Sequence, residues 1–513
     1  MKIKKILTAI CALSLAASTL TACGAGDYND GVATEPGNSW SGSPVVRPNI
    51  PDGMIIPDTG ELENYQTENV TERSFVSAAI TPDSYFSLDR NTASYSYMRR
   101  IISDGKKVAS GSVRLEEYIN YFSYDYARPT DGEALAVSGN LFDCPWNTEH
   151  KLMSIGVAAE EVTYGEKPNN IVFLIDTSGS MYGEDRLGLI QQSFSMIVEN
   201  LDDNDTVSIV TYAGDSRVAL SGESGKNKTK ICNVLQDLEA MGSTNGQGGI
   251  QKAYSLAQQY YSAEANNRVI LATDGDFNVG ASSKDALKSL ITQKRESGIY
   301  LSVLGVGMYN TNDITMKTLA ENGNGNYAYL DSVAEARKVL IEELGGTFNV
   351  VAKDAKMGVT FNDKVVDKYR LLGYESKMMS QEEFDDDKKD AGELGSGHTV
   401  TALYEVELKD NADGAVATCE VRYKTPDTEE NKSVSRTLAI SDYAESPNED
   451  TIFIGCVAEY ALVLRESRYK GDASLSNVIE RLSALDCTKE GGDQFKSEFL
   501  EVVKKAKQVY GAV

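Results

Sequence analysis

Histidine is nearly absent from this chain of 513 residues, which contains only His150 and His398. The two lie far apart in the sequence, and neither belongs to a cluster with metal-ligand spacing. Zinc hydrolases need several nitrogen or sulfur ligands, and general acid–base catalysis most often uses histidine. The composition therefore argues against a zinc hydrolase and offers no obvious histidine base.

Cysteine is also sparse, and no two of the seven cysteines form a CxxC pair. Cys11 and Cys23 fall near the N-terminus, which leaves five, an odd number. Such a set suggests neither a zinc site nor a complete disulfide framework. We expect the five to be small buried hydrophobic residues. They are Cys144, Cys232, Cys419, Cys456 and Cys487.

Basic residues are outnumbered, with 50 Lys and Arg against 76 Asp and Glu, which gives a net charge of −26. Nucleic-acid binding depends on neutralising phosphates with Lys and Arg, so this balance argues against a nucleic-acid partner. A basic surface or a bound cation is the more natural partner. The 41% hydrophobic and 25% charged composition is otherwise ordinary for a soluble globular protein.

Long apolar runs are missing beyond residue 20. The run at 6–20 follows three lysines and is shorter than a membrane span, as in a signal peptide. It ends in Leu20-Thr21-Ala22-Cys23, which resembles the lipobox of bacterial lipoproteins, whose cysteine becomes the lipidated N-terminus. We expect a signal peptide at 1–22, a lipid anchor on Cys23 and an extracytoplasmic protein at the cell membrane or envelope. The alternative is an ordinary secretory signal that contains a cysteine.

Two segments precede the most regular part of the chain. Residues 24–72 contain five of the eleven prolines and no regular period, so we expect a disordered spacer at 23–72. Residues 73–168 predict short helices followed by strands. Helical spacing predicts a helix at 113–126, and the segment 151–162 has the pattern of a strand.

Residues 169–345 alternate apolar strands with amphipathic helices. The strands are expected at 171–176, 206–213, 268–274 and 300–307. Between the first two, apolar residues recur at spacings of three and four, as on one face of a helix. This pattern predicts the α/β class, with a doubly wound and mostly parallel sheet covered on both faces.

The last third of the chain has a different pattern. Residues 346–445 show two-residue alternation, which predicts half-buried antiparallel strands, and residues 446–513 are helical. Strand-like segments without a complete core flank the α/β region, near 134–164 and 352–440. Because unpaired sheet edges are a liability, we predict that the two flanks pair in one β-sandwich into which the α/β domain is inserted.

The first α/β strand ends in an unusual way, on Asp176 followed by Ser178 and Ser180. Ligands bind at the carboxyl ends of the strands in such sheets, and residues two apart in an extended loop point the same way. A glycine-rich loop at 241–249 offers Thr244, and another strand ends on Asp274. All five side chains are hard oxygen donors, which suit one Mg²⁺ or Mn²⁺ ion.

These residues resemble the metal-ion-dependent adhesion site of von Willebrand factor type A domains. That site has the pattern Asp-x-Ser-x-Ser, then a loop threonine, then Thr-Asp-Gly, and all five positions are present here in order. The resemblance implies that the two serines and Thr244 coordinate the metal directly. It implies that Asp176 and Asp274 often act through water.

Longer segments resemble a bacterial lipoprotein family with a von Willebrand A domain and its own flanking domains. They lie at 86–102, 113–129 and 144–157, and again at 369–375, 385–406 and 464–475. The resemblance implies an N-terminal von Willebrand-associated domain at 73–168 and the A domain at 169–345. A β domain at 346–445 and helices at 446–513 follow.

Other possible sites are weaker. Aspartyl phosphatases need a second Asp two residues after the first, where this chain has Ser178. The glycine pattern at 323–328 follows a helix and precedes a strand, the wrong order for dinucleotide binding. The acidic run at 385–390 lacks EF-hand spacing and is expected to be a solvated loop. Tyrosine-rich segments near 95 and 118 have the spacing of packed helices.

Three hypotheses for function remain. In the leading one, the metal accepts an Asp or Glu carboxylate from a partner protein or peptide, so that the chain is a binding protein and not an enzyme. In the second, a structural or assembly lipoprotein uses the metal only to stabilise its own fold. The third, a metal-dependent hydrolase, lacks a nucleophile–base pair in the sequence.

Overall fold

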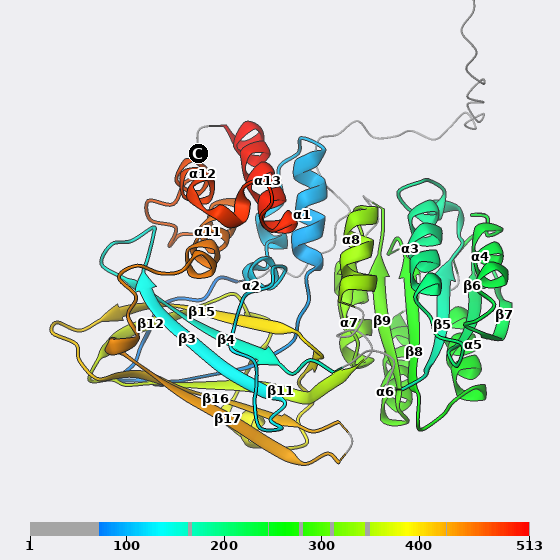
Figure 1. Ribbon diagram of the computed structural model, residues 1–513, viewed down its shortest axis with the longest axis horizontal. Coiled ribbons are helices and arrows are strands. Elements are labelled where there is room, and N and C mark those ends of the chain that lie inside the picture. Colours follow the sequence, from blue (N-terminus) through cyan, green and yellow to red (C-terminus); the bar gives the residue numbers. More distant parts are fainter. Residues whose placement is uncertain are drawn as a thin grey trace, which may run out of the picture. The chain divides into compact units, whose positions relative to one another are not determined.

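The computed structural model describes residues 71–162, 167–244, 246–275, 281–307, 312–343, 349–426 and 428–511. The predicted signal peptide, Cys23 and nearly all of the predicted spacer lie outside these residues. Within the described ranges, no helix combines the length and the apolar character needed to cross a membrane. The strands of these ranges form three sheets (Figure 1).

The central sheet belongs to the α/β domain, and its strand order is β10-β9-β8-β5-β6-β7. All neighbours are parallel except the antiparallel pair β6–β7. This confirms the predicted fold class and the four predicted strands. The strands are β5 (Asn169–Asp176), β6 (Thr206–Tyr212), β7 (Ser216–Ser224), β8 (Asn266–Thr273), β9 (Ile299–Gly305) and β10 (Tyr327–Tyr329).

Helices cover both faces of this sheet, and Ile171–Ile175 of β5 is accordingly an uninterrupted apolar run. Val172 and Leu174 pack in one core cluster with residues of α5 (Gly246–Gln259), α6 (Ala281–Glu296) and α7 (Asp313–Asn322). Phe173 points the other way and stacks on Phe194, with ring centroids 4.2 Å apart. That second face is covered by α3 (Leu187–Glu199), α4 (Lys228–Gln236), α8 (Val333–Arg337) and the π-helical η3 (Lys338–Glu342).

The other two sheets are antiparallel and face each other across a shared core. The first has the order β1 (Val76–Ser77), β12 (Val366–Leu372), β15 (Thr399–Leu408), β4 (Lys151–Ala159) and β3 (Leu135–Asp143). The second has the order β13 (Met378–Met379), β2 (Asp83–Ser87), β11 (Val350–Phe361), β16 (Ala415–Lys424) and β17 (Asn431–Ala439), and β14 (Gly392–Gly395) also pairs with β11.

Each sandwich sheet joins strands from before and after the α/β domain. Thr399–Val406 of β15 pairs with Lys151–Ala158 of β4, and β11 pairs with β2 in the same antiparallel manner. The predicted pairing of the two flanks is therefore confirmed. Neither flank contains a complete sheet by itself.

Burial corrects one part of the strand prediction. In β16 the expected face is buried, with Cys419 and Val421 inside and Thr418 outside. In β15, however, every residue from Thr399 to Val406 is buried, so the strand is not half-exposed. Its outer face is covered because α2 (Leu115–Ile119) lies on β15, and Leu403 belongs to a separate core cluster that includes helices from both ends of the described chain.

A layer of helices forms from the two ends of the described chain. It contains α1 (Ala93–Ser103) and α2 (Leu115–Ile119), followed much later by α11 (Glu449–Leu464), α12 (Leu475–Ala484) and α13 (Gln494–Tyr510). The short α10 (Gln381–Asp385) lies apart, on the sandwich. Nearly every residue of α11 is buried, as in a helix enclosed on all sides.

The predicted helix at 113–126 is too long, because α2 ends at Ile119. The next residue, Asn120, has its amide oxygen 2.7 Å from the Thr401 backbone nitrogen, from which it accepts a hydrogen bond. Its amide nitrogen donates to the Thr401 carbonyl oxygen at 3.2 Å. A side chain that satisfies the backbone of β15 in this way is fixed by tertiary contacts that helical spacing does not reveal.

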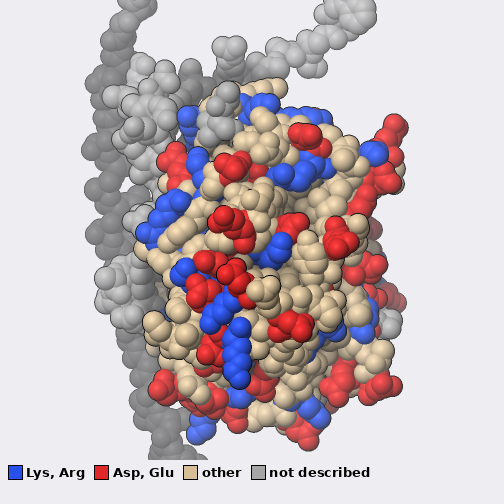
Figure 2. All heavy atoms as spheres, turned by 90° about the vertical axis from the view of Figure 1, so that its left-hand side faces the viewer, with Lys and Arg blue, Asp and Glu red and all other residues tan. Residues whose placement is uncertain are grey.

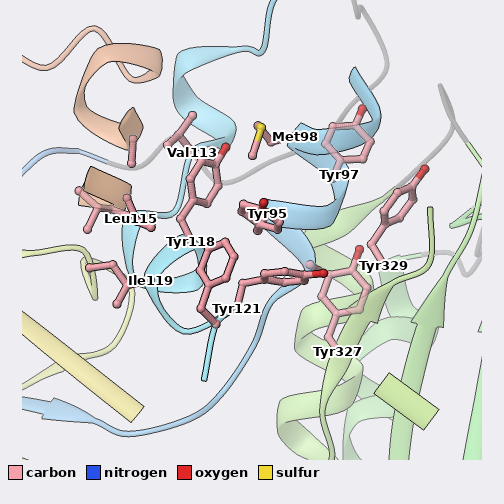
Figure 3. Packing of buried hydrophobic residues seen from close by; sticks show 14 of the residues in the cluster. Tyr95, Tyr97, Met98, Val113, Leu115, Tyr118, Ile119, Tyr121, Tyr327 and Tyr329 are labelled. Atoms are coloured by element: carbon pink, nitrogen blue, oxygen red, sulfur yellow. The ribbon is translucent and has the colours of Figure 1, made fainter. Parts of the chain in front are cut away.

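Tyrosines of the N-terminal helices join the helical layer to the α/β domain (Figure 3). Tyr95 stacks on Tyr121 with ring centroids 4.0 Å apart, and Tyr97 meets Tyr329 of β10 edge to face at 5.3 Å. Arg99 makes buried ion pairs of 2.7 Å with both Asp331 and Glu335. The tyrosine-rich segments are core and interdomain packing, as their spacing predicts.

The five cysteines outside the N-terminal segment are all free thiols. Cys144, Cys419 and Cys456 are buried as predicted, whereas Cys232 and Cys487 are half-buried. Burial raises the pKa of Cys144 to about 12 and that of Cys456 to about 11. These thiols therefore behave as small hydrophobic side chains at neutral pH.

Charge is less one-sided on the surface than the composition suggests. Figure 2 shows acidic and basic side chains interspersed on the face that lies at the left in Figure 1. Many carboxylates are paired, such as Asp354 with Lys424 at 2.6 Å and Asp385 with Arg422 at 2.8 Å. On that face, the net charge of −26 does not appear as a uniform acidic field.

Candidate metal site

Asp176 lies at the carboxyl end of β5 and is completely buried. Its Oδ1 accepts a hydrogen bond from the Ser178 backbone nitrogen at 2.9 Å. Its Oδ2 accepts from the Thr273 hydroxyl at 3.0 Å and from the Tyr212 hydroxyl at 3.2 Å. The carboxylate is thus fixed by the ends of three adjacent strands and by the loop that follows its own strand.

The electrostatics of this carboxylate are unusual. Burial raises the pKa of Asp176 to about 6, and the negative charge of Asp274 adds to the rise. Hydrogen bonds from Ser178 and Thr273 act in the opposite direction. Burial together with the Asp176 carboxylate also raises the pKa of Tyr212 well above its ordinary value, so Tyr212 remains a donor.

Ser178 and Ser180 are brought together as predicted, but by a different local structure. Their hydroxyl oxygens lie 3.1 Å apart. The chain between them is not extended, because Gly179–Met181 forms the single 3₁₀ turn η2. Ser178 is buried and Ser180 is half-buried, so the pair extends from the protein interior toward the surface.

The loop that carries Thr244 packs directly on the loop after β5. The Met241 backbone nitrogen donates to the Thr177 carbonyl oxygen at 2.8 Å, and the Gly179 nitrogen donates to the Gly242 carbonyl oxygen at 3.0 Å. A Cβ atom at Gly179 would lie 3.4 Å from that same Gly242 oxygen. Thr244 is half-buried two residues beyond this contact.

Asp274 follows β8, which is the neighbour of β5, and is buried. It directly follows Thr273, whose hydroxyl donates to Asp176. The structure therefore brings Asp176, Ser178 and Ser180 into one cluster, with Asp274 and the Thr244 loop beside it. Cys23, the other predicted site residue, lies outside the described residues.

Sequence reasoning missed three residues that build this cluster. Thr273 and Tyr212 hold the Asp176 carboxylate, and both stand at or beside the ends of predicted strands. Arg186 donates from Nη1 to the carbonyl oxygens of Ser180 at 3.1 Å and Tyr182 at 3.4 Å. No spacing rule marks Arg186, because its partners are backbone atoms.

The donor chemistry fits a hard divalent cation. Burial and the nearby charge of Asp274 disfavour the charged form of Asp176, and a cation bound beside this carboxylate and the hydroxyls would reverse that preference. Among the described residues, no three or more His, Cys, Asp or Glu side chains gather where they could hold a metal ion. The cluster differs from such groups because it has two acids and completes its oxygen set with hydroxyls.

Comparison with known families defines the class of the central domain. Residues 170–342 match the family model of the von Willebrand factor type A domain. Such domains generally mediate protein–protein interactions and commonly bind a divalent metal. The α/β part of the chain is therefore a von Willebrand factor type A domain.

The flanking regions identify the family. Residues 61–154 match a model described as von Willebrand factor, and residues 346–509 match the C-terminal region of "Uncharacterized protein YfbK". The chain is 35% identical over 480 residues to that protein from Escherichia coli strain K12, across 88% of this chain and 81% of the relative. This chain belongs to the YfbK family of bacterial von Willebrand A proteins.

More distant relatives align with a smaller share of this chain. Human inter-alpha-trypsin inhibitor heavy chain H3 is 26% identical over 201 residues, which is 37% of this chain and 22% of that protein. A solved von Willebrand factor type A structure from Catenulispora acidiphila is 13% identical, with a TM-score of 0.42. That alignment covers 72% of this chain and 89% of the solved one. Relatives of these kinds are typically non-catalytic.

Proposed function

We propose that this chain is a surface lipoprotein that binds a protein or peptide ligand through one divalent cation, Mg²⁺ or Mn²⁺. The cation is held by Asp176, Ser178, Ser180, Thr244 and Asp274, and the ligand supplies an Asp or Glu carboxylate. The observation that carries the proposal is the contact between two loops at the carboxyl end of β5, where hydroxyls gather beside the buried Asp176.

The residues of the proposed metal set differ in how deeply they are buried. Asp176 is fully buried and held by three donors, so it fixes the inner side of the cluster. Ser180 and Thr244 are half-buried and stand toward solvent. A cation held largely by neutral hydroxyls keeps much of its positive charge, so an incoming carboxylate can replace a bound water.

Cys23 anchors the protein in this proposal. Three N-terminal lysines, an apolar run and small residues before Cys23 support lipidation at that residue. The segment at 23–72 gives the domains reach above the membrane, on the order of 5–6 Å × √n for n flexible residues. Cys23→Ser is expected to move the protein from the membrane pellet to the soluble fraction, and retention in the pellet would place the anchor elsewhere.

A binding role is preferred to a catalytic one on the chemistry of the site. The hydroxyls of Ser178 and Ser180 bond each other, and no histidine activates them. His398 lies in the turn before β15, where burial lowers its pKa to about 3. His150 is bonded to Glu405 at 2.6 Å, on the sandwich. Neither histidine is bonded to a serine of the cluster, so neither is placed to act as its general base.

Surface plasmon resonance against fractionated envelope proteins tests the proposal. Binding by the mature chain is expected in Mg²⁺ and is expected to disappear in EDTA and in Thr244→Ala. Thr229→Ala, an exposed position on α4 outside these two loops, is the matched control and should bind like the wild type. Binding that persists unchanged in EDTA would refute metal bridging and favour a structural lipoprotein.

A further inference from the structure

A groove of about 540 Å³ lies beside the candidate metal site. It is lined by Thr177, by the β6–β7 turn at 213–217 and by the segment at 237–243. Thr177 stands between Asp176 and Ser178, and Gly242 and Ser243 directly precede Thr244. The groove and the proposed metal set are therefore built from the same two loops.

The charges that line this groove are unbalanced. Asp215 and Arg217 form an exposed ion pair of 3.1 Å and offset each other. Asp237 and Glu239 are also exposed, and no Lys, Arg or His of the described residues pairs with either of them. The groove thus offers two carboxylates without a basic partner in this part of the chain.

One apolar side chain stands out at the same place. Met241 is 63% exposed, whereas most large hydrophobic side chains of the chain are buried. Its backbone nitrogen is fixed to Thr177, so the side chain is presented by an anchored loop. An exposed and flexible thioether next to a groove is suited to packing against a ligand's apolar side chain.

We infer that this groove is a second subsite for the ligand, which takes a Lys or Arg side chain together with an apolar one. The inference rests on the proposed function, because the same ligand segment supplies the Asp or Glu carboxylate to the cation. A lone carboxylate approaching Asp237 and Glu239 would be repelled, whereas a neighbouring basic residue makes the approach favourable. The ligand is thus a short segment that carries both charges.

The contact between the groove and the loop after β5 limits the spacing between these ligand residues. In the groove, the Met241 backbone nitrogen lies 2.8 Å from the carbonyl oxygen of Thr177, which directly follows Asp176. An extended segment covers about 10 Å in three residues. The basic residue is therefore expected within three positions of the acid. The loss of one exposed charge pair typically weakens such binding by up to about five-fold.

A displayed library of random peptides, each with one fixed Asp, tests the subsite on the mature full-length protein. Peptides are captured in Mg²⁺ and eluted with EDTA, and the eluted sequences are read. We expect Lys or Arg to be enriched within three positions of the Asp. The double variant Asp237→Lys/Glu239→Lys should lose that preference and enrich a second acid, and Asp237→Asn/Glu239→Gln should lose it without a replacement.

Asp202→Lys/Asp203→Lys is the matched control, because these exposed residues precede β6 at the end of that strand away from the groove. It should keep the wild-type preference. EDTA-eluted peptides without a basic residue, or an unchanged preference in both groove variants, would overturn the subsite and leave metal-dependent binding standing. If no peptides elute with EDTA, the proposed function fails and the subsite fails with it.

Discussion

The Thr273 hydroxyl donates a hydrogen bond of 3.0 Å to Oδ2 of Asp176, and so joins the end of β8 to the end of β5. Tyr212 of β6 donates to the same oxygen at 3.2 Å. Because Oδ1 is taken by the Ser178 nitrogen, both oxygens of this carboxylate have structural partners. Asp176 is therefore part of the sheet's internal bonding and is not a free surface ligand.

Replacing Asp176 is expected to affect stability as well as metal binding. Asp176→Ala leaves three buried donors without an acceptor, which should lower the free energy of unfolding by about 1–3 kcal/mol. Chemical denaturation measures the change, with Asp203→Ala on the exposed turn as a control. An Asp176→Ala protein as stable as the wild type would contradict the hydrogen-bonding scheme.

Arg186 is expected to act as a positioning residue for the metal loop. Its Nη1 binds the carbonyl oxygens of Ser180 and Tyr182, so Arg186→Met should release the loop and weaken Mg²⁺ binding by about ten-fold. Arg186→Lys, which keeps one donor group, should recover part of the affinity. Calorimetric titration of the three proteins checks this order. Equal Mg²⁺ affinity in wild type and Arg186→Met would show that the loop does not need this contact.

A buried glutamate predicts a pH dependence of stability. Burial raises the pKa of Glu116 to about 7, with Glu375 and Glu117 adding to the rise and Lys317 opposing it. The folded state therefore holds a proton that the unfolded state releases above its ordinary pKa near 4.5. This stabilisation is fully present below pH 4.5 and is lost as the pH rises through about 7, by a total on the order of 3 kcal/mol.

Glu116→Gln should flatten this loss between pH 4.5 and 7 in denaturation curves, because an amide does not titrate. Glu117→Gln is the matched comparison, since Arg114 lowers the pKa of Glu117 against the effect of burial. That group stabilises the fold above its unfolded pKa and loses its contribution as the pH falls. Identical pH profiles for the Glu116→Gln protein and the wild type would show that Glu116 is not protonated in the folded state.

The interleaved sandwich predicts which fragments fold. Residues 346–445 lack β4 and β2, the partners of β15 and β11, so this fragment should aggregate or remain unfolded. Residues 169–345 contain a whole sheet with both helical layers and should fold alone. Size-exclusion chromatography and thermal melting of the two fragments test this prediction. A monomeric 346–445 fragment that melts cooperatively would contradict the account of the sandwich.

The α/β domain was predictable because its signals are local. Apolar runs such as Ile171–Ile175 and helical spacing in α3 report burial on both faces of a parallel sheet, whatever the rest of the chain does. The pairing of the flanks was predictable because neither flank has enough strands for a complete core. In both cases the sequence pattern and the tertiary structure favour the same arrangement of strands and helices.

The predictions that the structure corrects failed because they depend on long-range contacts. Helical spacing could not show that Asn120 is bonded to Thr401, which lies 281 positions away, or that α2 covers the outer face of β15. At the candidate metal site, the residue types were readable from their positions after strands. The residues that hold them in place could not be read from the sequence, because Thr273, Tyr212 and Arg186 act through a buried carboxylate or through backbone oxygens.

The most direct measurement is a calorimetric titration of Mg²⁺ into the mature wild-type chain and into Thr244→Ala. Thr244 is half-buried and stands outside the hydrogen-bond network of Asp176, so removing its hydroxyl should leave the fold intact. We expect one bound ion in the wild type and at least about ten-fold weaker Mg²⁺ binding in Thr244→Ala. The Mg²⁺ affinity of Ser243→Ala should be unchanged. No Mg²⁺ binding by the wild type, or equal binding by Thr244→Ala, would contradict it.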